Sequence, residues 1–144
     1  VNFNVAGQAG LGVFEAAVNA GGKEAGLTVI GVDSDQGMSF EKNDQLDRAE
    51  ITPTSMLKRV DISLYDAVKA YMDGTIEMGK TTYVGLEENC VGLANNKYYE
   101  ELVPADVKEA IDAAAADIAS GKITVVTALG MEQEDLVAYR DAVS

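Results

Sequence analysis

The sequence contains no histidine and a single cysteine, Cys90. Zinc sites and Ser-His-Asp triads depend on these residue types, so the composition argues against both. One cysteine also excludes an internal disulfide, and no apolar run is long enough to cross a bilayer. Basic residues are few, with 11 Lys and Arg against 24 Asp and Glu, and the net charge is −13. This charge disfavours nucleic acid, anionic lipid surfaces and polyanionic ligands, and favours an uncharged or cationic small molecule.

The start of the chain also lacks familiar signals. It has no initiator methionine, no signal peptide and no lipid-attachment cysteine, and its first residues are typical of a strand. We therefore expect an excerpt from a longer protein. The 144 residues, 47% of them apolar, suit one domain or one lobe of something larger.

The first 36 residues organise the chain. An apolar run, a glycine-rich turn, a helix and a second apolar run occupy residues 1–6, 7–12, 13–25 and 27–32. The second run is apolar on both faces, which is typical of a buried parallel strand. The order predicts one βαβ unit and an α/β fold. Ligands of such sheets bind beyond the carboxyl ends of the strands, where the glycine turn and the acidic segment 33–36 lie.

The rest of the chain is predicted as follows, in order: a loop at 37–50, a helix from Thr54 or Ser55 to Asp73, a strand at 81–86, an irregular segment at 87–99, a helix from Pro104 to Ala119, a strand at 123–126 and a last helix beginning near 132–135. Two helical stripes are predicted to face the core. They are Leu57, Val60, Leu64, Val68 and Tyr71, and Val107, Ile111, Ala114, Ala115 and Ile118.

The glycine-rich turn GQAGLG at 7–12 nearly matches the dinucleotide fingerprint G-x-G-x-x-G. Asp33 follows 21 residues after Gly12, where an acid would hold the ribose of NAD. Ala9 replaces the middle glycine, and its methyl group would push the phosphates away. An NAD-dependent enzyme domain is therefore one interpretation. A tight strand-to-helix turn with no ligand is another.

Four motifs occur in order along the chain. They are FNVAGQAGLGVF at 3–14, VIGVDSDQ at 29–36, TSMLKRVD at 54–61, and VGL at 84–86 with VGLA at 91–94. Together they resemble the basic membrane protein family, surface lipoproteins that serve as substrate-binding components of nucleoside-importing ABC transporters. The resemblance spans essentially the whole chain and maps to the carboxyl-terminal part of the family's proteins. It implies a two-lobed type I periplasmic-binding fold, of which residues 1–144 supply mainly one lobe, with elements crossing to the other.

The resemblance also implies a ligand, partners and a location. We expect a nucleoside, a purine nucleoside above all, and a transporter permease as partner, with no cofactor, no metal, no nucleic acid and no catalysis. The location would be the extracytoplasmic face of the bacterial membrane, reached through a lipid anchor absent from this chain, or the periplasm. A ligand-sensing regulatory protein on the same fold is a further alternative. The sequence contains no obvious nucleophile–base pair, which supports a binding protein.

Four residues are the main candidates for contacting the ligand. By the resemblance, Phe3 stacks on the base, Asp35 accepts hydrogen bonds from the ribose, and Asp33 pins the loop or assists. Lys58 is implied to bond the ribose and to pair with Asp35. The alternatives are core packing for Phe3, a turn-forming Asx pair for the two acids, and simple surface solvation for Lys58.

Two further residues, Gly10 and Phe14, complete the candidate ligand-binding set. Phe14 is the weaker of the two aromatic candidates, because a phenylalanine at a helix start is more often part of a core.

The chain is also expected to self-associate when it stands alone. In the resembling family the 55–73 helix packs in a lobe whose earlier strands are absent here, so its apolar stripe lacks part of its cover. We therefore expect these 144 residues by themselves to form a homo-oligomer.

Overall fold

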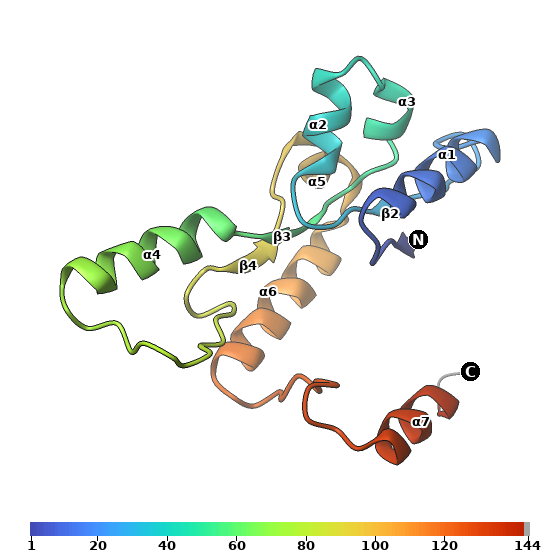
Figure 1. The fold of residues 1–144 in the computed structure, drawn as a ribbon. Helices are drawn as coiled ribbons and strands as arrows, with labels where there is room; N and C mark the ends of the chain where they lie inside the picture. The colour runs from blue at the N-terminus through green and yellow to red at the C-terminus, as the bar shows by residue number, and fades with distance from the viewer. Residues whose placement is uncertain (143–144) are drawn as a thin grey trace.

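The computed structural model describes residues 1–142, which form an α/β arrangement of short strands and helices (Figure 1). The strands are β1 (Asn2–Phe3), β2 (Val29–Ile30), β3 (Met56–Lys58) and β4 (Val91–Leu93). The helices are α1 (Leu11–Asn19), α2 (Gln36–Lys42), α3 (Leu46–Ala49), α4 (Val60–Met72), α5 (Lys97–Leu102), α6 (Ala105–Ala119) and α7 (Gln133–Asp141).

The strands form two two-stranded sheets, one of β1 and β2 and one of β3 and β4. β1 and β2 pair in parallel, and β3 and β4 pair antiparallel. A parallel bridge between Gly31 and Ser55 joins the two pairs, and Val29 N donates to Ile51 O at 2.8 Å. The predicted βαβ unit and α/β class are confirmed, because β1, α1 and β2 follow one another and the two strands run parallel.

The core lies between these strands and helices α1, α2, α3 and α5. Phe14 is fully buried and meets Phe40 edge to face, with ring centroids 4.9 Å apart. The buried cluster consists of Phe14, Val29, Phe40, Ala49, Ile51 and Tyr98. These residues come from α1, β2, α2, α3, the segment before β3, and α5, so the core fixes the strand ends relative to the helices.

The predicted loop at 37–50 is wrong, because the structure places α2 and α3 there. Asp35 is the N-cap of α2 and accepts a hydrogen bond from Met38 N at 3.1 Å. Phe40 and Ala49 anchor the two helices in the core. The many charged residues of this segment hide its amphipathic pattern in the sequence.

The predicted helix beginning at Thr54 or Ser55 is wrong at its start. The chain stays extended through β3, and α4 begins at Val60 after Arg59 as N-cap. Neighbouring backbone explains this, because Met56 N donates to Gly31 O and Ala94 N donates to Ser55 O, each at 2.9 Å. Hydrogen bonds to strands on both sides outweigh a local helical preference.

Other predictions hold in part. α6 ends at Ala119 as predicted, with Pro104 as its N-cap, and α7 follows Glu132. α1 ends at Asn19 instead of near residue 25, because Gly21 and Gly22 take positive φ angles of 107° and 50°. The segment 87–99, predicted to be irregular, includes β4 and the start of α5.

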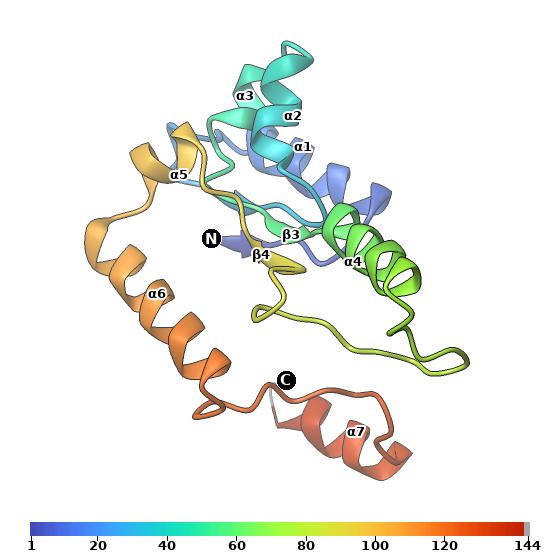
Figure 2. The ribbon, with the colours of Figure 1, turned by 90° about the vertical axis from the view of Figure 1, so that its left-hand side faces the viewer.

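The strands predicted at 81–86 and 123–126 do not form in the described part of the chain. Nor does the α4 stripe face a core, since Val60, Leu64 and Val68 are 56%, 64% and 52% exposed. Figure 2 shows α7 apart from α1, α2 and α3, and in Figure 1 α4 projects away from the strands. Within residues 1–142, no helix combines the length and the apolar character that crossing a membrane requires.

Candidate ligand-binding site

The carboxyl ends of three neighbouring strands bring the main candidate residues to one edge of the sheet. Phe3 ends β1, Asp33 and Asp35 follow β2, and Lys58 ends β3. The parallel register of β1 with β2, and of Gly31 with Ser55, makes these ends neighbours. We call Phe3, Asp33, Asp35 and Lys58 the carboxyl edge.

Asp33 and Lys58 contact each other twice at this edge. Lys58 N donates to Asp33 O at 3.0 Å, and Lys58 Nζ lies 3.0 Å from Asp33 Oδ1. Asp33 has a positive φ of 69°, a conformation that Asp tolerates better than most residues. Both side chains are about half exposed, at 49% and 59%. The pair is therefore accessible to a ligand and adds little to stability, as is usual for exposed ion pairs.

The pairing of Lys58 differs from the predicted one. The residue was expected to pair with Asp35 and to lie in the first turn of a helix. It ends β3 instead and pairs with Asp33, because the strand-to-strand bond from Lys58 N to Asp33 O sets the two side chains beside each other.

The Asp35 carboxylate is held by two neighbours. Its Oδ1 accepts from Met38 N at 3.1 Å, and Asn96 Nδ2 lies 2.8 Å from Oδ1 and 2.9 Å from Oδ2. A carboxylate accepts about four hydrogen bonds, so acceptor capacity remains for a ligand. The Asx-turn alternative is thus true of Asp35 in part, since the side chain caps α2, and this role does not use up its oxygens.

Phe3 is not part of the core. It is 49% exposed at the end of β1, and the buried cluster does not include it. A half-exposed ring at the end of a strand offers a flat apolar face to a planar ligand group.

Phe14 and Gly10 lie inside the protein. Phe14 has no exposed surface, so it offers no ring face to a ligand. Gly10 packs directly against the side chain of Asn4, which is 4% exposed and whose Nδ2 has no hydrogen-bond partner among the described residues. The role that the structure gives Gly10 is close packing.

Gly10→Ala should lower the free energy of unfolding by about 1–3 kcal/mol, because a new Cβ would overlap the trapped Asn4 side chain. Gly12→Ala is the matched control. Gly12 lies in α1 with open space around its Cα, so alanine there should be neutral or stabilising by up to about 1 kcal/mol. Chemical denaturation of both variants measures the two effects, and equal stability of the two would contradict the packing role of Gly10.

The sequence did not indicate Asn96 as a site residue. Its side chain bonds Asp35, which lies 61 residues earlier in the sequence. Asn96 is the N-cap of α5, and its Oδ1 accepts from Tyr98 N and Tyr99 N. An asparagine before a helix is a known N-cap signal, so the cap itself could have been predicted. Nothing in the local sequence indicates the bond to Asp35.

A second contact joins α2 to α5. Glu41 Oε1 lies 2.6 Å from Lys97 Nζ, and Tyr98 Oη donates to Glu41 Oε2 at 3.1 Å. The hydrogen bond from Lys97 holds the pKa of Glu41 below its usual value, and burial raises the pKa of Tyr98. A lowered carboxyl pKa means that Glu41 contributes stability above its unfolded pKa, and this contribution is lost as the pH falls through the folded value.

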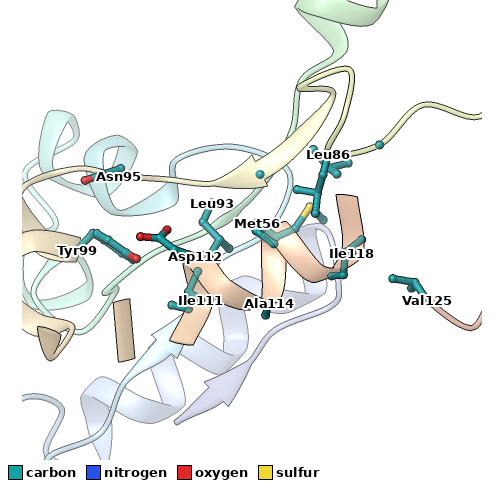
Figure 3. Close-up of a pocket in the computed structure, with 14 residues that line it drawn as sticks. Met56, Leu86, Leu93, Asn95, Tyr99, Ile111, Asp112, Ala114, Ile118 and Val125 are labelled. Atoms are coloured by element: carbon teal, nitrogen blue, oxygen red, sulfur yellow. The ribbon is translucent and has the colours of Figure 1, made fainter. Parts of the chain in front are cut away.

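A cavity of about 710 Å³ lies away from the carboxyl edge, between the β3–β4 pair and α6 (Figure 3). Most of its lining is aliphatic, with Met56 and Leu93 on the strands and Ile111 and Ile118 on α6. The polar side chains of the lining are Asn95, Tyr99 and Asp112, and the rest is apolar, so this surface suits a ribose with several hydroxyls less well than the carboxyl edge does. We therefore do not place a nucleoside there.

No group of three or more Cys, Asp or Glu side chains in residues 1–142 is arranged to hold a metal ion.

The model of the family described as "ABC transporter substrate-binding protein PnrA-like" matches residues 1–126. The chain belongs to this family. The match includes all four residues of the carboxyl edge and confirms the resemblance of the four sequence motifs to basic membrane proteins. It does not support the interpretation of the glycine turn as part of an NAD-dependent enzyme.

Named relatives agree with this assignment. Basic membrane protein D of Borreliella burgdorferi (strain JD1) is 35% identical over 96 residues, which cover 66% of this chain and 25% of the relative. Basic membrane protein B of Borrelia garinii subsp. bavariensis is 37% identical over 97 residues, with the same shares. The CD4+ T-cell-stimulating antigen of Listeria monocytogenes serovar 1/2a is 33% identical over 129 residues, which cover 87% of this chain and 35% of the antigen.

The chain thus spans between a quarter and about a third of the length of these relatives.

Proposed function

We propose that this chain is the carboxyl-terminal part of the solute-binding component of an ABC transporter, and that the full-length protein binds a nucleoside at the carboxyl edge. The protein delivers its ligand to a transporter permease and performs no catalysis. Family membership over residues 1–126 supports the solute-binding role.

One observation carries the choice of site. Three stretches that are separate in the sequence contribute an aromatic ring, two carboxylates and an ammonium group to the same sheet edge. This is the edge at which α/β sheets bind their ligands. The exposed faces of Phe3, Asp33 and Lys58 leave these groups free to contact a small molecule.

These groups match the parts of a nucleoside. The Phe3 ring stacks on the base, a contact that contributes about 1–3 kcal/mol and tolerates different bases. The Asp35 carboxylate accepts hydrogen bonds from the ribose diol, and Lys58 donates to the ribose. Asp33 holds Lys58 in place through their 3.0 Å contact. An uncharged ligand also suits a chain with a net charge of −13.

The rest of the site belongs to a second lobe in this proposal. The fold is a two-lobed type I periplasmic-binding fold, and residues outside this chain supply the opposite wall of the cleft and most contacts to the base edge. The large share of the relatives that this chain does not span is consistent with such a lobe. The protein acts on the extracytoplasmic side of the bacterial membrane, held by a lipid anchor or free in the periplasm.

Thermal unfolding of the full-length protein tests this function. Saturating adenosine or guanosine should raise the melting temperature, because a ligand that binds only the folded state stabilises it by mass action. NAD should leave the melting temperature unchanged. A shift with NAD and none with either nucleoside would overturn the proposal.

Lys58→Met should weaken inosine binding by about ten- to a hundredfold, the cost of a lost hydrogen bond from a charged group. The loss should be much smaller for 2′,3′-dideoxyinosine, since that ligand lacks the hydroxyls that Lys58 contacts. Lys80→Met is the matched control, because Lys80 is exposed and pairs with Glu77 instead. Equal losses for both ligands in a calorimetric titration would place Lys58 away from the ribose.

A further inference from the structure

Two helix caps face each other next to the carboxyl edge. Asp35 caps α2 by accepting from Met38 N, and Asn96 caps α5 by accepting from Tyr98 N at 2.9 Å and Tyr99 N at 3.1 Å. The amide nitrogen of Asn96 then donates to both Asp35 oxygens, at 2.8 and 2.9 Å. The two caps are thereby bonded to each other.

The direction of the Asn96 amide is fixed by its own helix. Its oxygen is occupied by two backbone N–H groups of α5, so its NH₂ group must point the other way, toward Asp35. α5 is itself well anchored, because Tyr98 and Tyr99 are both buried. Thr54 Oγ1 also donates to Ala94 O at 2.8 Å, which fixes the chain just before Asn96.

The terminal torsion of a free aspartate is broad, so a carboxylate without such a partner rotates over a wide range. Asn96 and Met38 N together restrict this rotation in Asp35. A ligand that binds an already oriented carboxylate loses less free energy to ordering than one that binds a mobile group.

We propose that Asn96 is a positioning residue that sets the orientation of the Asp35 carboxylate for ligand binding. The inference rests on the proposed function and deepens it, because it adds a residue that acts on the ligand only through Asp35. It also assigns a role to α5, which contributes no residue to the carboxyl edge itself.

Asn96→Asp isolates this role. The new carboxylate keeps an oxygen for Tyr98 N and Tyr99 N, so the cap of α5 remains. The NH₂ donor becomes a second negative oxygen about 3 Å from Asp35, and two carboxylates so close cannot both ionise without penalty. Inosine binding should fall by about tenfold or more at pH 7.5 and recover toward the parent value at pH 5.5, where the pair shares a proton.

Other charged groups near the two caps are the same in parent and variant. Asp33 and Lys58 lie along the edge, and Glu41 of α2 faces Lys97 and Tyr98 of α5. These groups are common to parent and variant, so the difference between the two proteins reports the new pair. Asn95→Asp is the matched control, because it adds the same charge one position away at an exposed residue that has no hydrogen bond to Asp35. Its affinity should equal that of the parent at both pH values.

The experiment is a calorimetric titration of the full-length parent, Asn96→Asp and Asn95→Asp with inosine at pH 5.5 and 7.5. A loss confined to Asn96→Asp that shrinks at pH 5.5 supports the proposal. A loss of equal size at both pH values, or no loss, overturns it. Asn96→Ser keeps a cap oxygen, removes the NH₂ group that reaches Asp35 and adds no charge. It should therefore show a loss independent of pH, and it serves if Asn96→Asp does not fold.

A ligand-free measurement separates this inference from the proposed function. The free energy of unfolding of Asn96→Asp should fall increasingly below that of the parent as the pH rises from about 4 to 7, because a carboxyl pKa raised in the folded state makes stability fall with rising pH. A gap that does not widen would show that the Asp35–Asn96 contact does not hold. If this stability difference widens but the parent protein binds no nucleoside, the Asp35–Asn96 contact is upheld. The proposed function is then refuted, and the positioning role with it.

Discussion

Asp35→Asn in the full-length protein is expected to abolish nucleoside binding at ordinary ligand concentrations. The carboxylate is proposed to accept two ribose hydroxyls, and each charge-assisted bond is worth about 1.5–3 kcal/mol. Asparagine removes the charge from both bonds and replaces one acceptor oxygen with an NH₂ donor, so binding should weaken by about a hundredfold or more. Fold stability should fall less than in an alanine variant, because asparagine is as good an N-cap as aspartate and can still accept from Met38 N, although its NH₂ group would face that of Asn96.

The alanine variant separates the ligand contact from the cap. Alanine at position 35 is expected to lower the melting temperature more than asparagine does, as well as to abolish binding. Alanine removes the side-chain acceptor for Met38 N and the partner of Asn96, so the variant should lose about 1 kcal/mol or more of stability along with binding. Calorimetry and thermal unfolding of both variants measure the two losses independently.

Asp47→Asn controls for the removal of one negative charge. Asp47 is an exposed acid in the first turn of α3 and bonds only to the neighbouring Arg48 N among the described residues. This control should bind like the parent. If Asp35→Asn also binds inosine as tightly as the parent, the assignment of Asp35 to the ligand is wrong.

A polypeptide of these 144 residues alone is expected to form dimers or larger oligomers at micromolar concentration, and to bind nucleosides far more weakly than the full-length protein. Its exposed apolar stripe on α4 includes Val60, Leu64 and Val68. The apolar cavity between β3–β4 and α6 is also open. Burying one such side chain contributes about 1.5–3 kcal/mol, so several together rival the 5–15 kcal/mol stability of a small domain. A second copy can cover these surfaces by face-to-face packing or exchange.

Sedimentation velocity over a range of micromolar concentrations tests this expectation. Leu64→Glu should shift the polypeptide toward monomer, because the new charge interrupts the exposed stripe. Tyr83→Glu is a control in the segment after α4, where the side chain is also exposed but lies outside the stripe. A stable, well-folded monomer of the parent would show that these residues form a self-sufficient core, and would refute our account of a missing lobe.

The sequence predicted the elements whose stability is local. The runs at 1–6 and 27–32 are apolar whatever their neighbours are, so the βαβ unit and the position of its carboxyl edge followed from pattern alone. Pro104 and the alanine-rich stretch after it set α6 in the same way. Each of these strands and helices depends on a pattern of residues close together in the sequence, which a single sequence displays.

The elements that were missed depend on distant partners. β3 is extended because Met56 N donates to Gly31 O on one side and Ala94 N donates to Ser55 O on the other. The composition of 54–61, by contrast, is typical of a helix start. Conversely, 81–86 is rich in β-formers but finds no strand to pair with in residues 1–142. Strand formation depends on pairing as much as on composition, so propensity failed in both directions.

The candidate site divides along the same line. Asp33 and Asp35 could be placed at the sheet edge because they follow a predicted strand. Lys58 was a candidate through the family resemblance alone, and the strand that brings it to this edge was not predicted. The pairing of Lys58 with Asp33, and the bond from Asn96 to Asp35, depend on backbone positions set by contacts up to 61 residues apart. No local pattern encodes such contacts.

Calorimetric titration of the full-length protein with inosine tests the central claim most directly. We predict saturable binding of one nucleoside per protein, lost in Asp35→Asn and strongly reduced in Lys58→Met. An absence of binding to inosine, adenosine and guanosine alike by the folded parent would contradict the claim that the carboxyl edge is a nucleoside site.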